Sequence, residues 1–303
     1  MARRLSPAIA FTASAAIVGL ALAGCGSSSL SSSPGTAGST PTVSQTKETS
    51  LAAKLPAKIK AAGKIVVGTD ATYAPNEFLG DDGKTVKGMD VDLFNAVAQK
   101  FGVEVDWVPA NFDSIILGVD SGKYDVGVSS FTINPDRKKQ VTMVSYFNAG
   151  TQWAAKTGAT IDADNACGKK IAVQTSTVQA DEIAARSKKC TDSGKAKITV
   201  DQYQAQSDAT NAVVTGKDDA MLADSPVCAY AVKQTNGQLA LLGDIYDSAP
   251  YGYVLPKDQA DTTAVAVQGA LKALIADGTY KTILAKWGVD AGAITDPTVN
   301  PTV

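Results

Sequence analysis

The sequence predicts an α/β protein of two similar lobes that are joined by two strand crossings. Short β-rich runs alternate with segments of helical periodicity, which indicates βαβ units and a mostly parallel sheet in each lobe. The pattern restarts after residue 155, because GKKIAVQTSTVQA at 168–180 repeats the opening of GKIVVGTDATYA at 63–74. Each half also closes on a Gly-Lys-x-Asp strand, GKYDVGVSSFT at 122–132 and GKDDAMLADSP at 216–226.

The first half is expected to begin with a buried strand, because KIVVGTDA is β-rich and bounded by Gly63. The helix after it has Phe94, Val97 and Phe101 at helical spacing, and Gly102 is suited to its C-terminal end. The expected elements are a strand at 64–71, a helix at 90–102, a strand at 103–108, a helix near 114–120 and a strand at 125–128.

The second half is expected to repeat this order, and the end of the chain is expected to return to the first lobe. Its elements are a strand from about 168, a helix at 179–188, a strand at 197–200, a helix at 205–214 and a strand at 220–222. The return comprises a strand at 250–257 and helices at 264–278 and 279–288.

These elements divide the chain into two lobes with a hinge between them. Two crossings, near 151–156 and 245–251, are expected to form the hinge, and two lobes around a hinge form a cleft. The expected bounds are 51–153 with 248–292 for the first lobe, 154–247 for the second and 293–303 for a C-terminal tail.

The N-terminus has the features of a processed segment. Arg3 and Arg4 precede an apolar run from about 8 to 21, which is too short to span a bilayer comfortably. The run ends at Leu-Ala-Gly-Cys25, which resembles the bacterial lipobox, where the cysteine receives a lipid and becomes the first mature residue. The alternative is an ordinary signal peptide with a chance cysteine. We expect a signal peptide at 1–24, a flexible Ser/Gly/Thr linker at 25–50, and a lipid-anchored protein on the extracytoplasmic face of the cell membrane.

Composition narrows the class of protein. The 303 residues are 45% hydrophobic and 19% charged, with a net charge of −2, so neither nucleic acid nor an anionic membrane surface is an expected partner.

Outside the cytoplasm a disulfide is permitted, and Cys167 and Cys190 bracket one helix-sized segment, so we expect them to pair. Cys228 is expected to be a buried free thiol. With no histidine in the chain, we expect no metal site and no Ser-His-Asp triad.

Polar residues gather where four of the expected strands end, and in open α/β sheets ligands bind beyond these ends. The ends carry Thr69 to Tyr73, Ser129 to Thr132, Gln174 to Thr177, and Asp224. Serine and threonine hydroxyls near Arg137 suit a carboxylate, because the guanidinium donates a planar fork to two oxygens. Asp224 on the opposite lobe suits an ammonium group. Together these residues predict a site for a zwitterion.

The ordered series of motifs is similar to a known family. From about Lys64 to Gly288 the chain resembles the family-3 extracellular solute-binding proteins of amino-acid ABC importers, which implies a two-lobed, periplasmic-binding-protein-like fold. The motifs are GTDATYAPNEF (68–78), GMDVDLFNAVA (88–98), ANFDSII (110–116), SSFTINPDRKK (129–139), GKKIAVQTSTVQ (168–179), MLADSP (221–226) and DGTYKTILAKWG (277–288).

The resemblance implies a role for each site residue. Arg137 corresponds to the arginine that pairs with the α-carboxylate, and Asp224 to the acceptor of the α-ammonium. Ser130 and Thr132 correspond to flanking groups that also touch the ammonium. The remaining candidates are Thr177 and Val178 as second-lobe donors to the carboxylate, Tyr73 and Phe112 as aromatics around the aliphatic part, and Asp70, Glu77 and Gln174 near the ligand's side chain.

Each assignment has a plainer alternative when the residue is considered alone. Arg137 lies among other charged residues and could be solvated, and Asp224 could cap the helix that follows it. Asp70 could be a turn residue. Tyr73 and Phe112 could be aromatic residues of the core.

The resemblance also implies the function and partners. We expect a free amino acid as ligand, an ABC permease with its ATPase subunits as partner, a monomer, and no cofactor. If Asp70 faces the ligand's side chain, its charge disfavours an acidic ligand and favours a polar or basic one. Two alternatives stay open, namely a dehydratase-like enzyme on the same fold and a lipid-anchored amino-acid sensor.

Overall fold

The computed structural model describes residues 44–303, which form one compact unit with two sheets. The larger sheet has eight strands in the order β5-β1-β6-β11-β7-β10-β8-β9. Its strands are β1 (Lys64–Thr69), β5 (Glu104–Pro109), β6 (Val126–Gly127), β7 (Thr142–Lys156), β8 (Lys170–Gln174), β9 (Thr199–Tyr203), β10 (Ala220–Asp224) and β11 (Leu239–Leu255). The smaller sheet contains β2 (Thr72–Tyr73), β3 (Glu77–Leu79) and β4 (Val86–Lys87).

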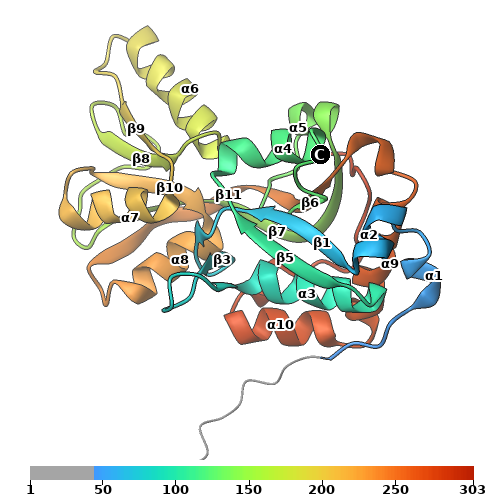
Figure 1. Cartoon of the computed structure of the whole chain (residues 1–303). Coiled ribbons are helices and arrows are strands. Elements are labelled where there is room, and N and C mark those ends of the chain that lie inside the picture. The colour runs from blue at the N-terminus through green and yellow to red at the C-terminus, as the bar shows by residue number, and fades with distance from the viewer. Residues whose placement is uncertain (1–43) are drawn as a thin grey trace, which may run out of the picture. The chain divides into compact units, whose positions relative to one another are not determined.

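Two long antiparallel strands, β7 and β11, run through the middle of the larger sheet and belong to both of its halves (Figure 1). On one side β1 pairs in parallel with β5 and β6, and β6 pairs with β11. On the other side β10 pairs with β7 and in parallel with β8, which pairs with β9. We call the half with β1 the first lobe and the half with β8 the second. The expected crossings near 151–156 and 245–251 lie within these two strands, which the sequence predicted as much shorter connections.

Helices cover the sheet in both lobes (Figure 1). The helices of the first lobe are α1 (Thr49–Ala52), α2 (Ala57–Ala62), α3 (Met89–Phe101), α4 (Phe112–Asp120), α5 (Pro135–Gln140), α9 (Thr263–Ala276) and α10 (Thr279–Trp287). Those of the second are α6 (Val178–Asp192), α7 (Gln206–Thr215) and α8 (Ser225–Gln234). Two short 3-10 helices, η1 (Lys257–Gln259) and η2 (Asp290–Gly292), follow β11 and α10. No helix between residues 44 and 303 is long and apolar enough to cross a membrane.

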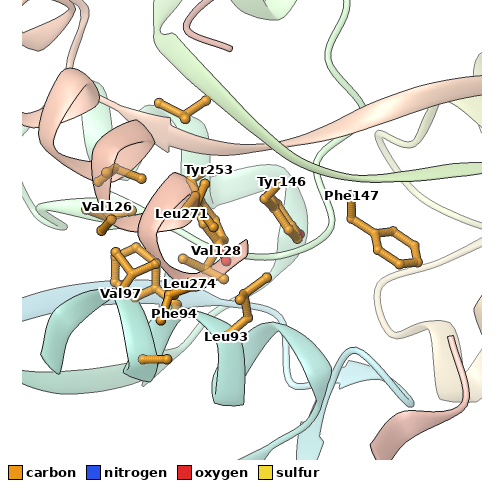
Figure 2. Packing of buried hydrophobic residues seen from close by; sticks show 14 of the residues in the cluster. Leu93, Phe94, Val97, Val126, Val128, Tyr146, Phe147, Tyr253, Leu271 and Leu274 are labelled. Atoms are coloured by element: carbon orange, nitrogen blue, oxygen red, sulfur yellow. The ribbon is translucent and has the colours of Figure 1, made fainter. Parts of the chain in front are cut away.

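The core of the first lobe holds the sheet against α3 and α9, as the helical spacing of apolar residues predicts. Phe94 and Val97 of α3 and Leu271 of α9 are fully buried in one cluster with Val126 of β6 (Figure 2). Each such side chain stabilises the fold by about 1.5–3 kcal/mol. Helix α3 ends at Gly102, whose φ of 69° is a left-handed conformation that favours glycine. This packing fixes the strand ends that carry the polar residues described below.

Both ends of the described chain pack against the first lobe. Gln45 donates its backbone N–H to Gln99 Oε1 over 2.9 Å, and the ammonium of Lys100 lies 3.3 Å from Glu48, so residues 44–50 join the lobe ahead of the expected start at Leu51. At the other end, Ser145 donates its N–H to the carbonyl of Thr298, which holds the tail at 293–303 against β7. The expected signal peptide, most of the linker and Cys25 lie outside the described residues.

The expected disulfide is present. Cys167 and Cys190 are bonded, with their Cα atoms 5.7 Å apart, and the bond ties the segment before β8 to α6. Cys228 is a buried free cysteine on α8, where its thiol lies 3.2 Å from the carbonyl oxygen of Gln152. Burial raises the pKa of this thiol, so it stays protonated at neutral pH.

Candidate functional site

A small cavity of about 10 Å³, enough for about one water molecule, lies between the two lobes, at the carboxyl ends of the strands. Strand ends of both lobes reach it because parallel strands place their carboxyl ends at one edge of the sheet. Nine of the eleven residues predicted to bind ligand line this cavity, and Asp70 and Glu77 lie outside its wall. The lining comprises Tyr73, Phe112, Ser129, Ser130, Thr132, Arg137, Gln174, Thr177, Val178, Gln179 and Asp224.

Arg137 reaches the cavity from α5 of the first lobe. Asn134 fixes the start of this helix by accepting the backbone N–H of Arg137 over 2.8 Å. The guanidinium donates to the carbonyl oxygens of Thr132 at 2.8 Å and Ser176 at 3.1 Å, and it lies over the ring of Phe112. Burial lowers the pKa of Arg137 to about 10, so the group is still a cation at neutral pH. It is therefore a positioned charge rather than a solvated one.

Asp224 reaches the same cavity from the end of β10 in the second lobe. The residue precedes α8, but its side chain makes no capping hydrogen bond to that helix. Its carboxylate instead accepts from Gln179 Nε2 at 2.8 Å and from the Tyr73 hydroxyl at 2.9 Å. Burial raises the pKa of Asp224, while these bonds and the charge of Arg137 oppose the rise. The alternative that Asp224 caps the helix is not realised.

The two opposite charges face one cavity without touching. Among the ion pairs of the described residues, none joins Arg137 to Asp224. Both side chains nevertheless line the same space, and each is held by contacts of its own. This arrangement provides a cationic pole on one lobe and an anionic pole on the other, which suits the two charges of a zwitterion.

The two predicted aromatic residues form part of the wall and also belong to the buried clusters. Phe112 stacks on Phe131, with ring centroids 4.6 Å apart. Tyr73 is 6% exposed, and its hydroxyl is at the boundary between the lobes. The core and the site interpretations therefore both apply to Tyr73 and Phe112.

Two serines adopt left-handed backbone conformations, each just after a strand end, one in each lobe. Ser130 has a φ of 51° after β6, and Ser176 has a φ of 60° after β8. Non-glycine residues rarely occupy this region, and such strain is concentrated at functional sites. Ser176 offers its carbonyl oxygen to Arg137, and Ser130 lines the cavity.

Helix α6 begins at the cavity wall. Thr177 caps it, because the hydroxyl oxygen accepts the backbone N–H of Ala180 over 3.1 Å and donates to the carbonyl of Gln174. The hydroxyl is therefore occupied within the protein. The backbone at Thr177 and Val178 lies at the positive end of a 15-residue helix, which favours an anion nearby.

Asp70 lies beside the cavity rather than in its wall. Its carboxylate accepts two bonds from Thr72, one from the backbone N–H of Phe112 and one from Gln174 Nε2 across the lobe boundary at 2.9 Å. These donors occupy its acceptor positions. Burial raises the pKa of Asp70, and the same four bonds oppose the rise. The residue lines a separate hollow, of about 260 Å³, together with Asn111 and Gln204.

Glu77 lies behind the cavity wall, in the first lobe. It is fully buried, and its carboxyl group accepts from the hydroxyls of Ser129 at 3.1 Å and Ser130 at 3.3 Å. It therefore contacts the residues that line the cavity and not the cavity itself.

Ser129 and Gln179 also line the cavity, although neither was assigned a role from the sequence. Ser129 was named with Ser130 in the strand end SSFT, and the resemblance matched a role to Ser130 alone. Gln179 gave no signal, because a glutamine in the first turn of a helix is usually solvated. Here Gln179 is 2% exposed, and its Nε2 bonds to Asp224.

The chain is similar to several proteins whose names describe amino-acid binding. The chain is 35% identical to the arginine-binding protein ArgT of Corynebacterium glutamicum over 251 residues, or 82% of each chain. It is 31% identical to the L-cystine-binding protein TcyJ of Escherichia coli K12, covering 76% of this chain and 84% of that protein.

Among solved structures, an ancestral amino-acid-binding protein described as a precursor of cyclohexadienyl dehydratase superposes with a TM-score of 0.65. The two chains are 32% identical, and the match covers 76% of this chain and 97% of the other. The model of the bacterial extracellular solute-binding proteins, family 3, matches residues 65–290, which is most of the described chain. The protein therefore belongs to the family-3 bacterial extracellular solute-binding proteins, as the order of its motifs predicted.

Proposed function

We propose that the protein binds one free amino acid with a basic or polar side chain between its lobes and delivers it to an ABC permease. The observation that carries this proposal is the placement of Arg137 and Asp224 on opposite lobes around one cavity. In this proposal the α-carboxylate of the ligand pairs with Arg137 and lies near the start of α6. The α-ammonium donates to Asp224, and to Ser130 and the carbonyl of Thr132 on the first lobe.

The charges around the cavity favour a basic side chain. Arg137 and Asp224 balance the two charges of the amino acid's backbone, and Asp70 adds a buried carboxylate beside them. A cationic side chain would be attracted by this extra charge in a poorly hydrated site, and an acidic one would be repelled. The similarity to an arginine-binding protein supports a basic ligand, while the similarity to a cystine-binding protein keeps a polar zwitterion as the second candidate.

Binding is proposed to act through closure of the two lobes. The ligand first meets Arg137 and the serines of the first lobe, and closure then brings the start of α6 and Asp224 onto it. The contacts that cross between the lobes, such as Gln174 to Asp70 at 2.9 Å and the N–H of Gln206 to Thr72 at 3.1 Å, form in the same step. The closed form is the one that the permease would recognise.

The proposed lipid anchor at Cys25 would keep the protein near its permease at a raised effective concentration. Cys25→Ala should release the protein from the membrane fraction into the soluble extracytoplasmic fraction. Retention of the variant in the membrane fraction would contradict the anchor without touching the ligand assignment.

A thermal-shift screen tests the ligand. The twenty amino acids, ornithine, citrulline and cystine are each added to the full folded chain, since a ligand at 100 times its Kd stabilises by about 2.7 kcal/mol. We expect arginine, lysine or ornithine to give the largest shift, with calorimetry to follow. No shift with any of them would remove the proposal.

A dehydratase-like enzyme is the second candidate, because one structural neighbour is described as a precursor of such an enzyme. Asp224 favours the binding role, since an acceptor for an ammonium group has no partner in a cyclic acid that lacks nitrogen. Turnover assays with prephenate-like acids separate the two. A sensor that reports amino-acid level would use the same closed state, and a signalling partner recovered by crosslinking to the liganded form would distinguish it.

A further inference from the structure

The floor of the cavity rests on two buried carboxyl groups, Glu77 of β3 and Asp90 of α3. Both residues are 0% exposed. The hydroxyl oxygen of Ser130 lies 3.3 Å from Glu77 Oε2 and 3.3 Å from Asp90 Oδ2, so the two groups meet at one serine. Among residues 44–303, no lysine or arginine nitrogen lies within 4.0 Å of either carboxyl group.

The two carboxyl groups have unequal hydrogen-bond partners. Asp90 Oδ2 accepts from the backbone N–H of Ser130 at 3.1 Å and from the Tyr146 hydroxyl, in addition to the shared serine hydroxyl. Asp90 Oδ1 is buried and receives no hydrogen bond from the groups that ordinarily donate. Glu77 accepts only from the hydroxyls of Ser129 and Ser130. Apart from the shared serine hydroxyl, Asp90 has two donors and Glu77 has one, which marks Asp90 as the ionised member, and the unpaired Asp90 Oδ1 requires a further donor.

We infer that Glu77 and Asp90 share one proton as an acid–carboxylate pair, and that this pair draws the hydroxyl protons of Ser129 and Ser130 towards itself and away from the cavity. Two buried carboxylates this close do not both ionise. The proton on Glu77 donates to Asp90, and Asp90 keeps the single negative charge. The other titratable groups that face the pair are Asp70 at the end of β1, Tyr146 of β7, Tyr253 of β11 and Tyr280 of α10. None of them is a cation.

The consequence is a fixed polarity of the cavity floor. Ser130 Oγ receives Asn76 Nδ2 at 2.9 Å, and Ser129 Oγ receives the backbone N–H of Asp70 at 3.0 Å. Each hydroxyl must therefore direct its own proton to the acid pair, which leaves a lone pair for the cavity. Both serines line the cavity, so they present acceptors there. An ammonium group can donate hydrogen bonds to these two hydroxyl oxygens. Glu77 and Asp90 are thus positioning residues, and this part of the inference rests on the proposed function.

The protonation of the pair can be tested without any ligand. The chain has only four glutamates, Glu48, Glu77, Glu104 and Glu182. In protein labelled with ¹³C at the glutamate carboxyl, infrared spectroscopy at neutral pH should show one protonated carboxylic acid in the wild type. The band should be absent in Glu77→Gln and retained in Glu104→Gln, which alters an exposed glutamate. A wild type with only ionised glutamates would overturn the inference, whatever the ligand proves to be.

The orientation of the serines is tested by binding, with arginine as the probe. Glutamine mimics a protonated Glu77, because its amide donates to Asp90 and its carbonyl accepts from a serine. We expect Glu77→Gln to keep the Kd within about threefold, and Glu77→Ala to raise it about tenfold, the effect of one lost buried hydrogen bond. Equal losses in both variants would overturn the orienting role. Absence of arginine binding by the wild type would instead count against the proposed ligand and leave the infrared result to decide on the pair.

Discussion

Tyr73 of the first lobe donates its phenolic O–H to Asp224 of the second lobe over 2.9 Å, and the same phenolic oxygen accepts the backbone N–H of Asp224 at 3.1 Å. The two residues are 151 positions apart in the chain. A single side chain thus bonds twice to the strand end that provides the anionic pole of the cavity. The contact connects closure of the lobes to the orientation of the carboxylate that is proposed to bind the ammonium group.

Replacement of Tyr73 by phenylalanine removes both bonds and keeps the ring in the wall. A hydrogen bond to a charged group contributes about 1.5–3 kcal/mol, so the Kd for the amino acid should rise by about 10- to 100-fold. Calorimetry measures the Kd, and small-angle scattering measures the fraction of closed protein, which should fall. Tighter binding by Tyr73→Phe would show instead that the tyrosine competes with the ligand for Asp224.

Arg137→Ala should abolish the thermal shift given by every amino acid. The substitution removes the cationic pole and leaves Asp224 without its opposing charge, which should weaken binding by about 100-fold or more. Lys139→Ala is the matched control, because Lys139 lies on the same helix and pairs only with exposed Asp136 over 2.6 Å. A normal shift in Arg137→Ala would refute the carboxylate assignment.

The disulfide should contribute stability without affecting the ligand. Cys167 and Cys190 close a loop with a sequence separation of 23 residues, and loop-closure entropy predicts a loss of about 3 kcal/mol in the double Cys→Ser variant. For a chain of this size the Tm should fall by roughly 6–12 °C in calorimetry, while the Kd stays the same. Cys228→Ser, which changes the free cysteine, should leave the intact-mass signature of the disulfide unchanged. A Tm unaltered by loss of the disulfide would contradict the entropic account.

Asp70→Asn should change the ranking of ligands more than the ability to bind. The substitution removes a buried negative charge beside the cavity, so basic amino acids should lose affinity relative to glutamine. Competition calorimetry with arginine and glutamine measures the ratio of their Kd values. Asp113→Asn is a suitable control, since Asp113 is an exposed residue on the adjoining helix α4. An unchanged ratio would remove Asp70 from the choice of ligand.

The regular elements could be predicted because their signals are local. The apolar spacing in α3, the Gly-Lys strands and the return of the C-terminal helices depend on periodicity, which a single sequence carries. The length of β7 and β11 could not be predicted, because both strands are partly polar and obtain their pairing from each other across about a hundred residues. Only the assembled sheet shows that β7 and β11 form a central pair of strands that both lobes share.

The site was predictable to the extent that its residues stand at strand ends. Arg137 and Asp224 follow such ends and carry charge, so sequence position and chemistry agree. The position of Glu77 was not predictable, because the sequence gives no indication of which side of the wall a carboxylate occupies. The left-handed conformation of Ser130 was also not visible, since it follows from long-range bonds to Asp90 and Glu77 and not from a serine's own preference.

The stability of the protein should depend on pH through Glu77. Burial raises the pKa of Glu77 well above its usual range, and the neighbouring Asp90 raises it further. In the unfolded chain a glutamate ionises near pH ~4.3, so above this pH the native state holds one proton more than the unfolded state. The stability contributed by this proton is complete below pH ~4.3 and is lost as the pH rises towards the folded pKa, at up to about 1.4 kcal/mol per pH unit.

Urea denaturation of the wild type and of Glu77→Gln between pH 5 and 8 tests this effect, because glutamine cannot take up or release the proton that Glu77 and Asp90 share. The free energy of unfolding of the wild type should fall relative to that of the variant as the pH rises, since glutamine carries its donor at every pH. Glu104→Gln should follow the wild type throughout, because Glu104 is exposed and lies outside the pair. Parallel curves for the wild type and Glu77→Gln would mean that Glu77 is already ionised at pH 5, and the acid–carboxylate pair would then have to be abandoned.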